Sequence, residues 1–328
     1  MAEWRSTALK RLKETYKSDD VVIPGLQRHV MRQMAKDDEE RSPHVIHPSE
    51  MVKPEWCGRH DYYRITDTPV EKKGANNPSF NMANAFAEGH TIHEKYQTWL
   101  WEMGVLYGSW KCERCYHRWT ALSPIICPVC ESPWLHYMEV SLSRPPYLIN
   151  GHADGAVHDL DSWTGLIEVK SIGIGTIRFE APMMHQRYLD GKETLDEMWF
   201  KINRPFPSHM KQGQIYLWLS WPRYSQICFI YESKFHQKQK EFLVSYNPKL
   251  IAPLIDMAKD VSQGVRAGIA PERPVWAIDM QVKTCRSCTY RKTCWSIDEP
   301  DEEAAPKTTP VRVKRADSRK RRAALSQT

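Results

Sequence analysis

The stretch Gly165–Ser171, with the sequence GLIEVKS, decides which fold this chain is expected to adopt. Its apolar residues include two β-branched side chains, which predicts a buried strand. Glu168 and Lys170 lie two residues apart within the stretch, and alternate residues of a strand point to the same face. A carboxylate and an ammonium group therefore leave one face of an apolar strand together, which simple packing does not require.

A second carboxylate is expected beside this pair. Asp154 lies in GHADG, within the preceding predicted strand, and an antiparallel neighbour would bring it next to Glu168. Two carboxylates on adjacent strands suit Mg²⁺ or Mn²⁺, and Lys170 on the same face could contact a phosphate oxygen or a metal-bound water. Such a site would stabilise charge on a phosphate. The alternative for these residues alone is a cross-strand salt bridge on a solvated sheet face.

Two helical pairs flank the acidic strands. Gly89 and His93 lie four residues apart in the helix predicted for residues 78–103, and His93 could supply an imidazole ligand. Gln212 and Tyr216 have the same spacing in the helix predicted for residues 208–220. Neither pair is specific alone, since a lone helical histidine is usually a core or surface residue.

The ordered set of motifs is far more specific than its parts. G-x3-H, G-x2-D, E-x-K and Q-x3-Y follow one another along the chain, and this order resembles the RecB-like branch of the PD-(D/E)XK nucleases from about residue 49 to 295. The resemblance implies an α/β fold with a mixed sheet core flanked by helices. It also implies a metal-dependent DNA exonuclease in which His93, Asp154, Glu168 and the Val169 backbone carbonyl bind catalytic metal, Lys170 assists hydrolysis, and Gln212 and Tyr216 position DNA.

Eight of the nine cysteines form two groups. The first is C-x2-C-x11-C-x2-C, a spacing in which two tight turns can direct four sulfurs at one ion, and it predicts a small zinc ribbon inserted at residues 106–138. A second iron–sulfur site or a degenerate ribbon stays open as an alternative. The ninth cysteine, Cys228, is expected to be a buried strand residue. The ribbon cysteines are Cys112, Cys115, Cys127 and Cys130.

The second group has one cysteine far upstream and three near the end of the nuclease-like region. This pattern resembles the CRISPR-associated RecB-like exonucleases and the nuclease domain of AddB, in which such cysteines hold a 4Fe–4S cluster as a structural staple. A second zinc site is the alternative. The inserted ribbon, the long separation of Lys170 from Gln212 and a basic tail depart from the compact pattern, and a chain of this kind also resembles phage-borne nucleases. The group comprises Cys57, Cys285, Cys288 and Cys294.

Charge is distributed unevenly along the 328 residues. The net charge is +6, but residues 304–328 carry eight Lys/Arg and one acid, which leaves −1 for residues 1–303. The body is therefore not a generally basic nucleic-acid binder. The amphipathic N-terminus has no apolar signal core, and no run of about 18 apolar residues occurs, so no membrane partner and a cytoplasmic location in a bacterial or phage-infected cell are expected.

Three regions are expected along the chain. Residues 1–48 should hold a short N-terminal helix over 1–17 and a polar, irregular linker, residues 49–298 the nuclease domain, and residues 299–328 a disordered basic tail. The segments 137–142, 147–160 and 165–171 are predicted to be strands of an antiparallel meander. Strands at 225–232 and 241–247 and a helix over 248–269 should follow the helix that carries Gln212.

Two function classes remain on the sequence alone. The first is the exonuclease, acting on single-stranded DNA or DNA ends in recombination, repair or replication, with a helicase or a single-strand annealing protein as a candidate partner. An endonuclease subunit of a larger helicase–nuclease complex is its variant, and the chain has no Walker-type motif of its own. The second is a non-catalytic nucleic-acid-binding module built on zinc and iron–sulfur.

Overall fold

The computed structural model describes residues 22–40, 42–71 and 79–296 of the chain. The chain divides into two compact units, residues 1–291 and 292–328. The helix expected over residues 1–17 and the tail over residues 299–328 lie outside the described residues. In the part that is described, no helix has both the length and the apolar character needed to cross a membrane.

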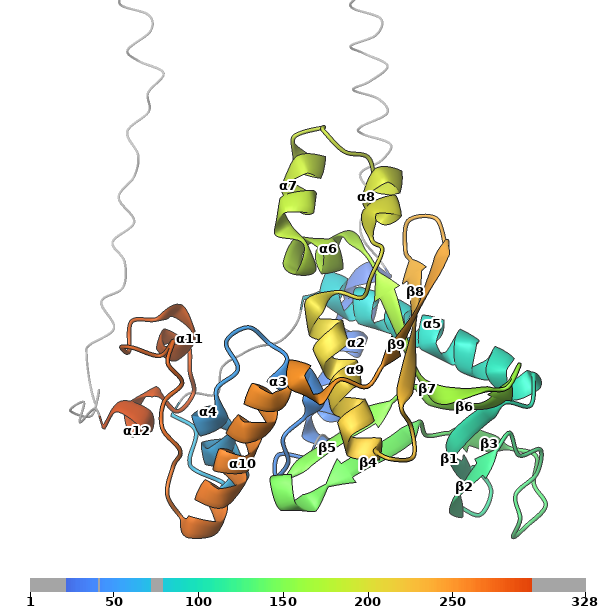
Figure 1. Ribbon diagram of the computed structural model, residues 1–328, viewed down its shortest axis with the longest axis horizontal. Helices are drawn as coiled ribbons and strands as arrows, with labels where there is room; N and C mark the ends of the chain where they lie inside the picture. The colour runs from blue at the N-terminus through green and yellow to red at the C-terminus, as the bar shows by residue number, and fades with distance from the viewer. Residues whose placement is uncertain (1–21, 41, 72–78, 297–328) are drawn as a thin grey trace, which may run out of the picture. The chain divides into compact units, whose positions relative to one another are not determined.

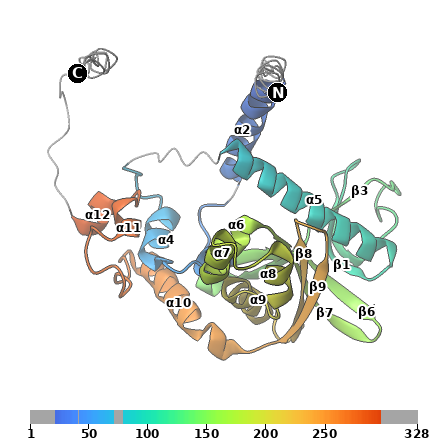
Figure 2. The same cartoon turned by 90° about the horizontal axis from the view of Figure 1, so that it is seen from above.

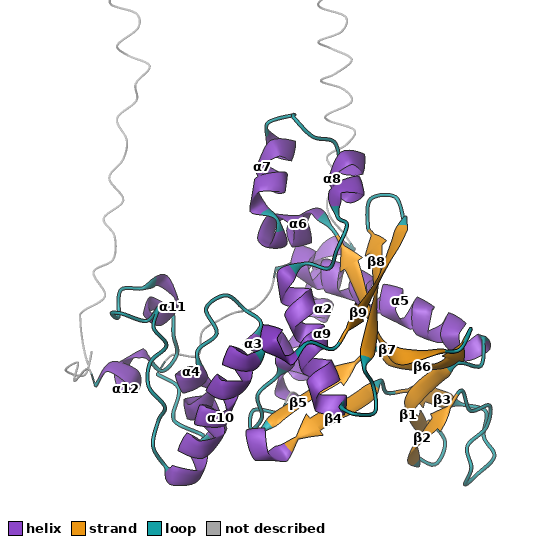
Figure 3. Cartoon of the chain, in the orientation of Figure 1, coloured by secondary structure: helices purple, strands orange, loops and turns teal. Residues whose placement is uncertain are grey.

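A mixed sheet forms the centre of the first unit (Figures 1 and 3). Its strands follow the order β2-β1-β6-β7-β8-β9, and β3 pairs with β1. The pair β7–β8 is parallel and the other pairs are antiparallel. The strands are β1 (Leu106–Cys112), β2 (Arg118–Leu122), β3 (Leu135–Tyr137), β6 (Gly155–Leu160), β7 (Trp163–Ile172), β8 (Gln226–Ser233) and β9 (Gln239–Ser245).

β7 contains the stretch Gly165–Ser171 with Glu168 and Lys170. Its middle is buried, and it lies between β6 and β8. The turn that leads into β7 is a two-residue hairpin turn, because Leu160 pairs with Trp163 and both intervening residues, Asp161 and Ser162, have positive φ angles of 49° and 68°.

Two long helices pack against the sheet, and they carry the motifs that contain His93 and Gln212. α5 (Phe80–Glu102) begins at Ser79, whose side chain accepts a hydrogen bond from the Met82 N–H, and α5 packs against β7. α9 (Pro207–Ser220) begins with proline in its first turn, packs against β8, and supplies the crossover that a parallel strand pair requires. Both helices match their predicted limits to within two residues.

The strand expected over residues 147–160 is divided into two strands that belong to different sheets. β5 (Ile149–Ala153) pairs with β4 (Val140–Arg144) in a small two-stranded sheet, whereas β6 belongs to the central sheet. The break falls at Asp154. The expected antiparallel pairing of consecutive strands holds for β4–β5 and for β6–β7, but the two pairs lie in different sheets because the chain changes sheets at Asp154.

The cysteine-bearing segment is part of the central sheet. β1 pairs with β6 through Leu106↔Val157 and Tyr107↔Ala156, and it also carries β2 and β3. Its buried Trp110 joins Leu100 of α5 and Ile167 of β7 in one apolar cluster. The segment inserted between the His93 and Asp154 motifs therefore extends the main sheet. Cys228 lies in the same cluster, buried in β8 as expected.

The linker expected to be irregular contains a helix. α2 (Ile23–Glu40) places apolar residues at Ile23, Leu26 and Val30, a helical spacing that a polar average composition obscures, and it contacts α5.

Helices α6, α7 and α8 occupy the stretch 172–206. The remaining helices are α3 (Pro48–Met51), α4 (Gly58–Ile65), α6 (Ile174–Glu180), α7 (Pro182–Leu189), α8 (Leu195–Lys201), α10 (Ala252–Ala267), α11 (Lys283–Arg286) and α12 (Arg291–Trp295), with short 3₁₀ turns η1 (Pro145–Tyr147) and η2 (Pro248–Leu250).

Figure 2 shows α5 running along the sheet, with α6, α7, α8 and α9 grouped beside β8. Gly89 makes the close approach of α5 to β7 possible, because a Cβ atom there would lie 3.3 Å from Ser171 Oγ. One helical turn further along α5 is His93. The packing of α5 therefore sets the distance between His93 and the acidic strand.

Candidate active site

Asp154 lies between the two sheets and faces the acidic strand. The β6–β7 register pairs Gly155 with Ile167, so one step further places Asp154 opposite Glu168, as the sequence predicted. The Val169 N–H donates to Asp154 Oδ2 at 2.6 Å, which fixes the carboxylate against β7. Asp154 and Glu168 are both buried, so their charges are mostly out of water.

His93 approaches Asp154 from α5. Its Nδ1 lies 3.3 Å from Asp154 Oδ1. Burial opposes the charged imidazole, but Asp154 and Glu168 outweigh that effect and raise the pKa of His93 above its usual value. The Gln97 side chain, one turn along α5, donates to the Asp154 backbone carbonyl at 2.9 Å and ties the helix to the same corner.

Lys170 connects the acidic strand to α9. Its Nζ donates to Glu168 Oε1 at 2.7 Å and to Gln212 Oε1 at 3.1 Å. Gln212 Nε2 in turn donates to Tyr216 Oη at 2.8 Å. Burial opposes the charged form of Lys170, yet Glu168 and Asp154 raise its pKa, so this side chain is an ammonium group at neutral pH.

The geometry thus brings together all six side chains named from the sequence. They form two connected groups, His93 with Asp154 and Lys170 with Glu168, Gln212 and Tyr216, and the two groups meet at β7. The residues come from α5, the β5–β6 junction, β7 and α9. Separations of up to 123 residues along the chain are closed by the fold.

One oxygen of this network lacks a partner. Glu168 Oε2 is buried and accepts no hydrogen bond from protein. Burial and the nearby charge of Asp154 raise the pKa of Glu168, which shows that the ionised form is costly in this position. Asp154 lies opposite Glu168 in the β6–β7 register and His93 contacts Asp154, so the three side chains supply ligand types that fit Mg²⁺ or Mn²⁺.

Two further residues of the site were not predicted. Glu139, between β3 and β4, has a pKa raised to about 7 by burial and by the charge of Asp154. His209, on α9 one turn before Gln212, contacts Tyr231 Oη. Glu139 could have been found by extending the β4–β5 register, which requires knowing the hairpin first. His209 has no such signal, because its position depends on how α9 packs.

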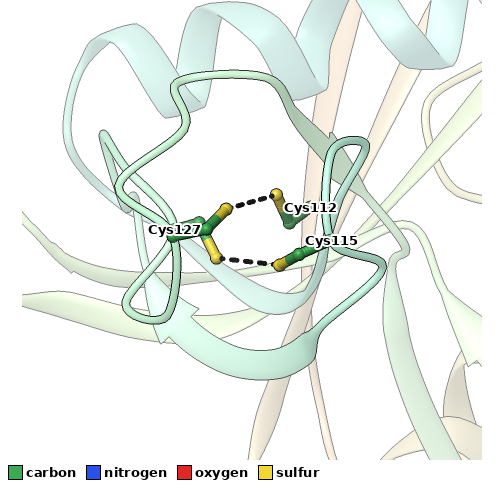
Figure 4. Close-up of side chains that lie close together, drawn as sticks. Cys112, Cys115 and Cys127 are labelled. Carbon is green, nitrogen blue, oxygen red and sulfur yellow. Dashed lines mark hydrogen bonds between the residues drawn. The ribbon is translucent and has the colours of Figure 1, made fainter.

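The cysteines of the ribbon converge on one point (Figure 4). Sγ of Cys112 lies 3.5 Å from Sγ of Cys130, Sγ of Cys115 lies 3.7 Å from that of Cys127, and all four sulfurs are within 4.8 Å of one another. Tetrahedral Zn²⁺ with bonds of about 2.3 Å places its sulfurs about 3.8 Å apart. The four thiols therefore form a Cys₄ group that could hold a metal ion.

The other cysteines lie at the ends of the first unit and beyond it. Cys57 is the residue before α4, and Cys285 lies in α11. The segment that follows α11 packs on α4, since the Tyr290 ring contacts His60 with centroids 5.2 Å apart. The Glu71 N–H also donates to the Thr289 carbonyl at 3.1 Å. Cys294 belongs to the second unit, so the four-cysteine set remains a prediction of the sequence.

Comparisons with known proteins give distant similarities only. No family model and no curated protein matches the chain. A solved structure described as SSO0001 is 12% identical over 85% of this chain and 98% of its own, with a TM-score of 0.37. The alkaline exonuclease LHK-Exo from Laribacter hongkongensis is 13% identical over 69% of this chain and 90% of its own, with TM-scores of 0.37 alone and 0.35 in complex with dAMP. Such scores are too low to establish a shared fold, so the function proposed below depends on the residues of this chain.

Proposed function

We propose that this chain is a divalent-metal-dependent deoxyribonuclease of the PD-(D/E)XK type that degrades DNA from its ends. One observation supports the proposal most strongly. Motifs from four separate elements meet in connected contacts around Glu168, a buried carboxylate with an unpartnered oxygen. An ion pair within β7 needs Glu168 and Lys170 alone, and it would require neither Asp154 nor His93 beside them.

The proposed chemistry assigns a role to each residue. Asp154, Glu168, His93 and the Val169 carbonyl would hold the cation, which would supply an activated water and charge neutralisation when bound. An ammonium group has three donors, and Glu168 and Gln212 occupy two of those of Lys170. The third is available for a non-bridging phosphate oxygen. Gln212 and Tyr216 keep Lys170 oriented and border the DNA.

The cysteines have structural roles in this proposal. The Cys₄ ribbon holds Zn²⁺, and because β1 pairs with β6 it stiffens the edge of the sheet that leads to Asp154. A 4Fe–4S cluster on the second cysteine group joins the start of the nuclease region to its end. The proposal also includes three expectations from the sequence. They are the domain limits, a cytoplasmic location, and a pathway in phage recombination or CRISPR adaptation.

A cleavage assay tests the proposal. Purified protein is incubated with single- and double-stranded DNA labelled at either end and with covalently closed circles, in Mg²⁺, Mn²⁺ or chelator. The proposal predicts metal-dependent release of short products from labelled ends and slower loss of circles. Equal cutting of circles and linear DNA would instead favour the endonuclease variant.

The second candidate is the non-catalytic nucleic-acid-binding module. The ribbon favours it in one respect, since a surface tyrosine and tryptophan, Tyr116 and Trp134, are 68% and 71% exposed and could stack on bases. This candidate predicts DNA binding without cleavage under every metal condition. The same assay, read beside a binding measurement, separates the two.

A further inference from the structure

His209 is a residue of the site to which the proposed chemistry assigns no role. It lies in the first turn of α9, three residues before Gln212, so both side chains are on one face of the helix and about 4.5 Å apart along its axis. Its partner Tyr231 is on β8, where the β7–β8 register pairs it directly with Lys170. Paired residues of neighbouring strands project from the same face of a sheet. His209 therefore lies beside Lys170 and Gln212, next to the position proposed for the phosphate.

The hydrogen bonds of Tyr231 determine which nitrogen of His209 carries the proton. The Phe206 N–H donates to Tyr231 Oη at 2.9 Å, and Nδ1 of His209 lies 2.5 Å from the same oxygen. Tyr231 is fully buried, and burial raises its pKa, so its O–H group is retained and needs an acceptor. Because the Phe206 N–H can only donate, the Tyr231 O–H donates to Nδ1. A neutral imidazole whose Nδ1 accepts has its proton on Nε2.

The Nε2–H group of His209 is available to a ligand. Burial, and secondarily the charge of Lys170, lowers the pKa of His209 to about 3, so the ring is neutral at neutral pH. Among the described residues, none accepts a hydrogen bond from Nε2, and Nε2 is not one of their buried unpartnered polar atoms, so it keeps access to solvent. The half-buried ring is thus fixed through Nδ1 and has one free donor, close to the ammonium group of Lys170.

We propose that His209 donates from Nε2 to a phosphate oxygen of the bound DNA strand, next to the phosphate that Lys170 contacts. The inference rests on the proposed function and deepens it. Contacts to phosphate oxygens fix the register of a strand without reading its sequence, and a neutral donor makes such a contact without repelling a nearby metal cation. Tyr231 is the positioning residue, because its hydroxyl keeps the proton of His209 on Nε2.

Two substitutions separate this donor from a structural role. His209→Asn places its amide near Nδ1, where it can still accept from Tyr231, and leaves no donor at the position of Nε2. His209→Gln reaches further and restores an amide N–H near that position. Binding of a short, labelled single-stranded DNA to the full-length protein, followed by fluorescence anisotropy, should weaken about 10-fold or more for His209→Asn and stay within about threefold of wild type for His209→Gln. The exposed His136→Asn is the control and should bind as wild type does.

A series of oligonucleotides, each with one phosphate replaced by an uncharged methylphosphonate, locates the contact. At one position the replacement should weaken binding by wild type and His209→Gln but not by His209→Asn, because that variant has no contact to lose. Equal binding by wild type and His209→Asn, or effects that are additive at every position, would overturn the proposal. Equal losses in His209→Asn and His209→Gln would also overturn it, since they indicate a structural role.

The binding measurement does not depend on hydrolysis. If wild type binds DNA but cleaves none with Mg²⁺ or Mn²⁺, the nuclease proposal fails while the binding data still decide the role of His209. No DNA binding by wild type would contradict both proposals. If His209→Asn does not fold, Tyr231→Phe replaces it, since loss of the hydroxyl lets the proton move to Nδ1 and should reduce one of the methylphosphonate effects seen in wild type. Unchanged effects at every position in Tyr231→Phe would overturn the proposal.

Discussion

Glu168 is unfavourable for stability in the position where the proposed chemistry needs it. Its side chain is 3% exposed, one oxygen has no partner, and Asp154 lies opposite it across the strands. Lys170 compensates one oxygen of this carboxylate, and the other oxygen lowers the free energy of unfolding unless a metal cation binds it. Functional sites commonly contain such conflicts between stability and activity.

Replacing Glu168 with glutamine should therefore separate stability from activity. In chelator, Glu168→Gln should melt within a few degrees of wild type, because relief of repulsion from Asp154 offsets loss of the ion pair with Lys170. With Mn²⁺, only wild type should gain stability, in proportion to ligand binding. Thermal unfolding followed by circular dichroism measures both. A variant that melts several degrees below wild type in chelator would contradict this description of Glu168.

A second prediction at this scale concerns pH. Burial, and secondarily the charge of Lys170, lowers the pKa of His209 to about 3. The unfolded chain binds this proton near pH 6.5, whereas the folded chain does not until about pH 3, so stability should fall as pH decreases below 6.5. The melting temperature of His209→Gln should fall less steeply than that of wild type between pH 6.5 and 4. The exposed His136→Gln is the control, and equal slopes in all three proteins would show that His209 does not titrate as described.

Among the elements, those set by local sequence could be predicted and those set by tertiary packing could not. The limits of α5 and α9 follow from apolar spacing and from Ser79 and Pro207 at their starts. The break of one expected strand at Asp154 depends on a change of sheet, which strand propensity does not encode. The pairing of β1 with β6 is likewise tertiary, and it makes the ribbon part of the sheet. Glu139 was missed for this reason, since its place beside Asp154 depends on the β4–β5 hairpin.

The two cysteine groups should respond separately to substitution. Protein purified without oxygen should contain one zinc and about four irons, if one Cys₄ group holds Zn²⁺ and the other a 4Fe–4S cluster. Cys112→Ser should lose zinc and keep the brown colour, whereas Cys285→Ser should lose iron and keep zinc. Because Cys112 ends β1, zinc loss should also lower the melting temperature. Metal analysis with visible absorption measures this, and a colourless wild-type protein with two zincs would overturn the cluster assignment.

Across the whole molecule, the uneven distribution of charge indicates that DNA capture and catalysis depend on different segments of the chain. Residues 304–328 lie outside the described residues and carry more positive charge than the net charge of the chain. Each phosphate that such a segment neutralises steepens the dependence of binding on salt. Deleting residues 304–328 should weaken DNA binding most at low salt and leave turnover at saturating DNA unchanged. Binding titrations over a salt series measure this, and identical slopes with and without the segment would exclude a role in DNA capture.

The strand that carries Glu168 and Lys170 is proposed to hydrolyse DNA with a divalent cation. Lys170→Ala removes the ammonium group proposed to contact the phosphate, and by analogy with lost transition-state donors its rate should fall by about 100- to 1,000-fold. The measurement is the single-turnover rate on end-labelled DNA in Mn²⁺, compared for wild type, Lys170→Ala and the exposed control Lys249→Ala at saturating protein. We predict cleavage by wild type and the control, none in chelator, and the stated loss in Lys170→Ala. Cleavage by well-folded Lys170→Ala at the wild-type rate would contradict the account.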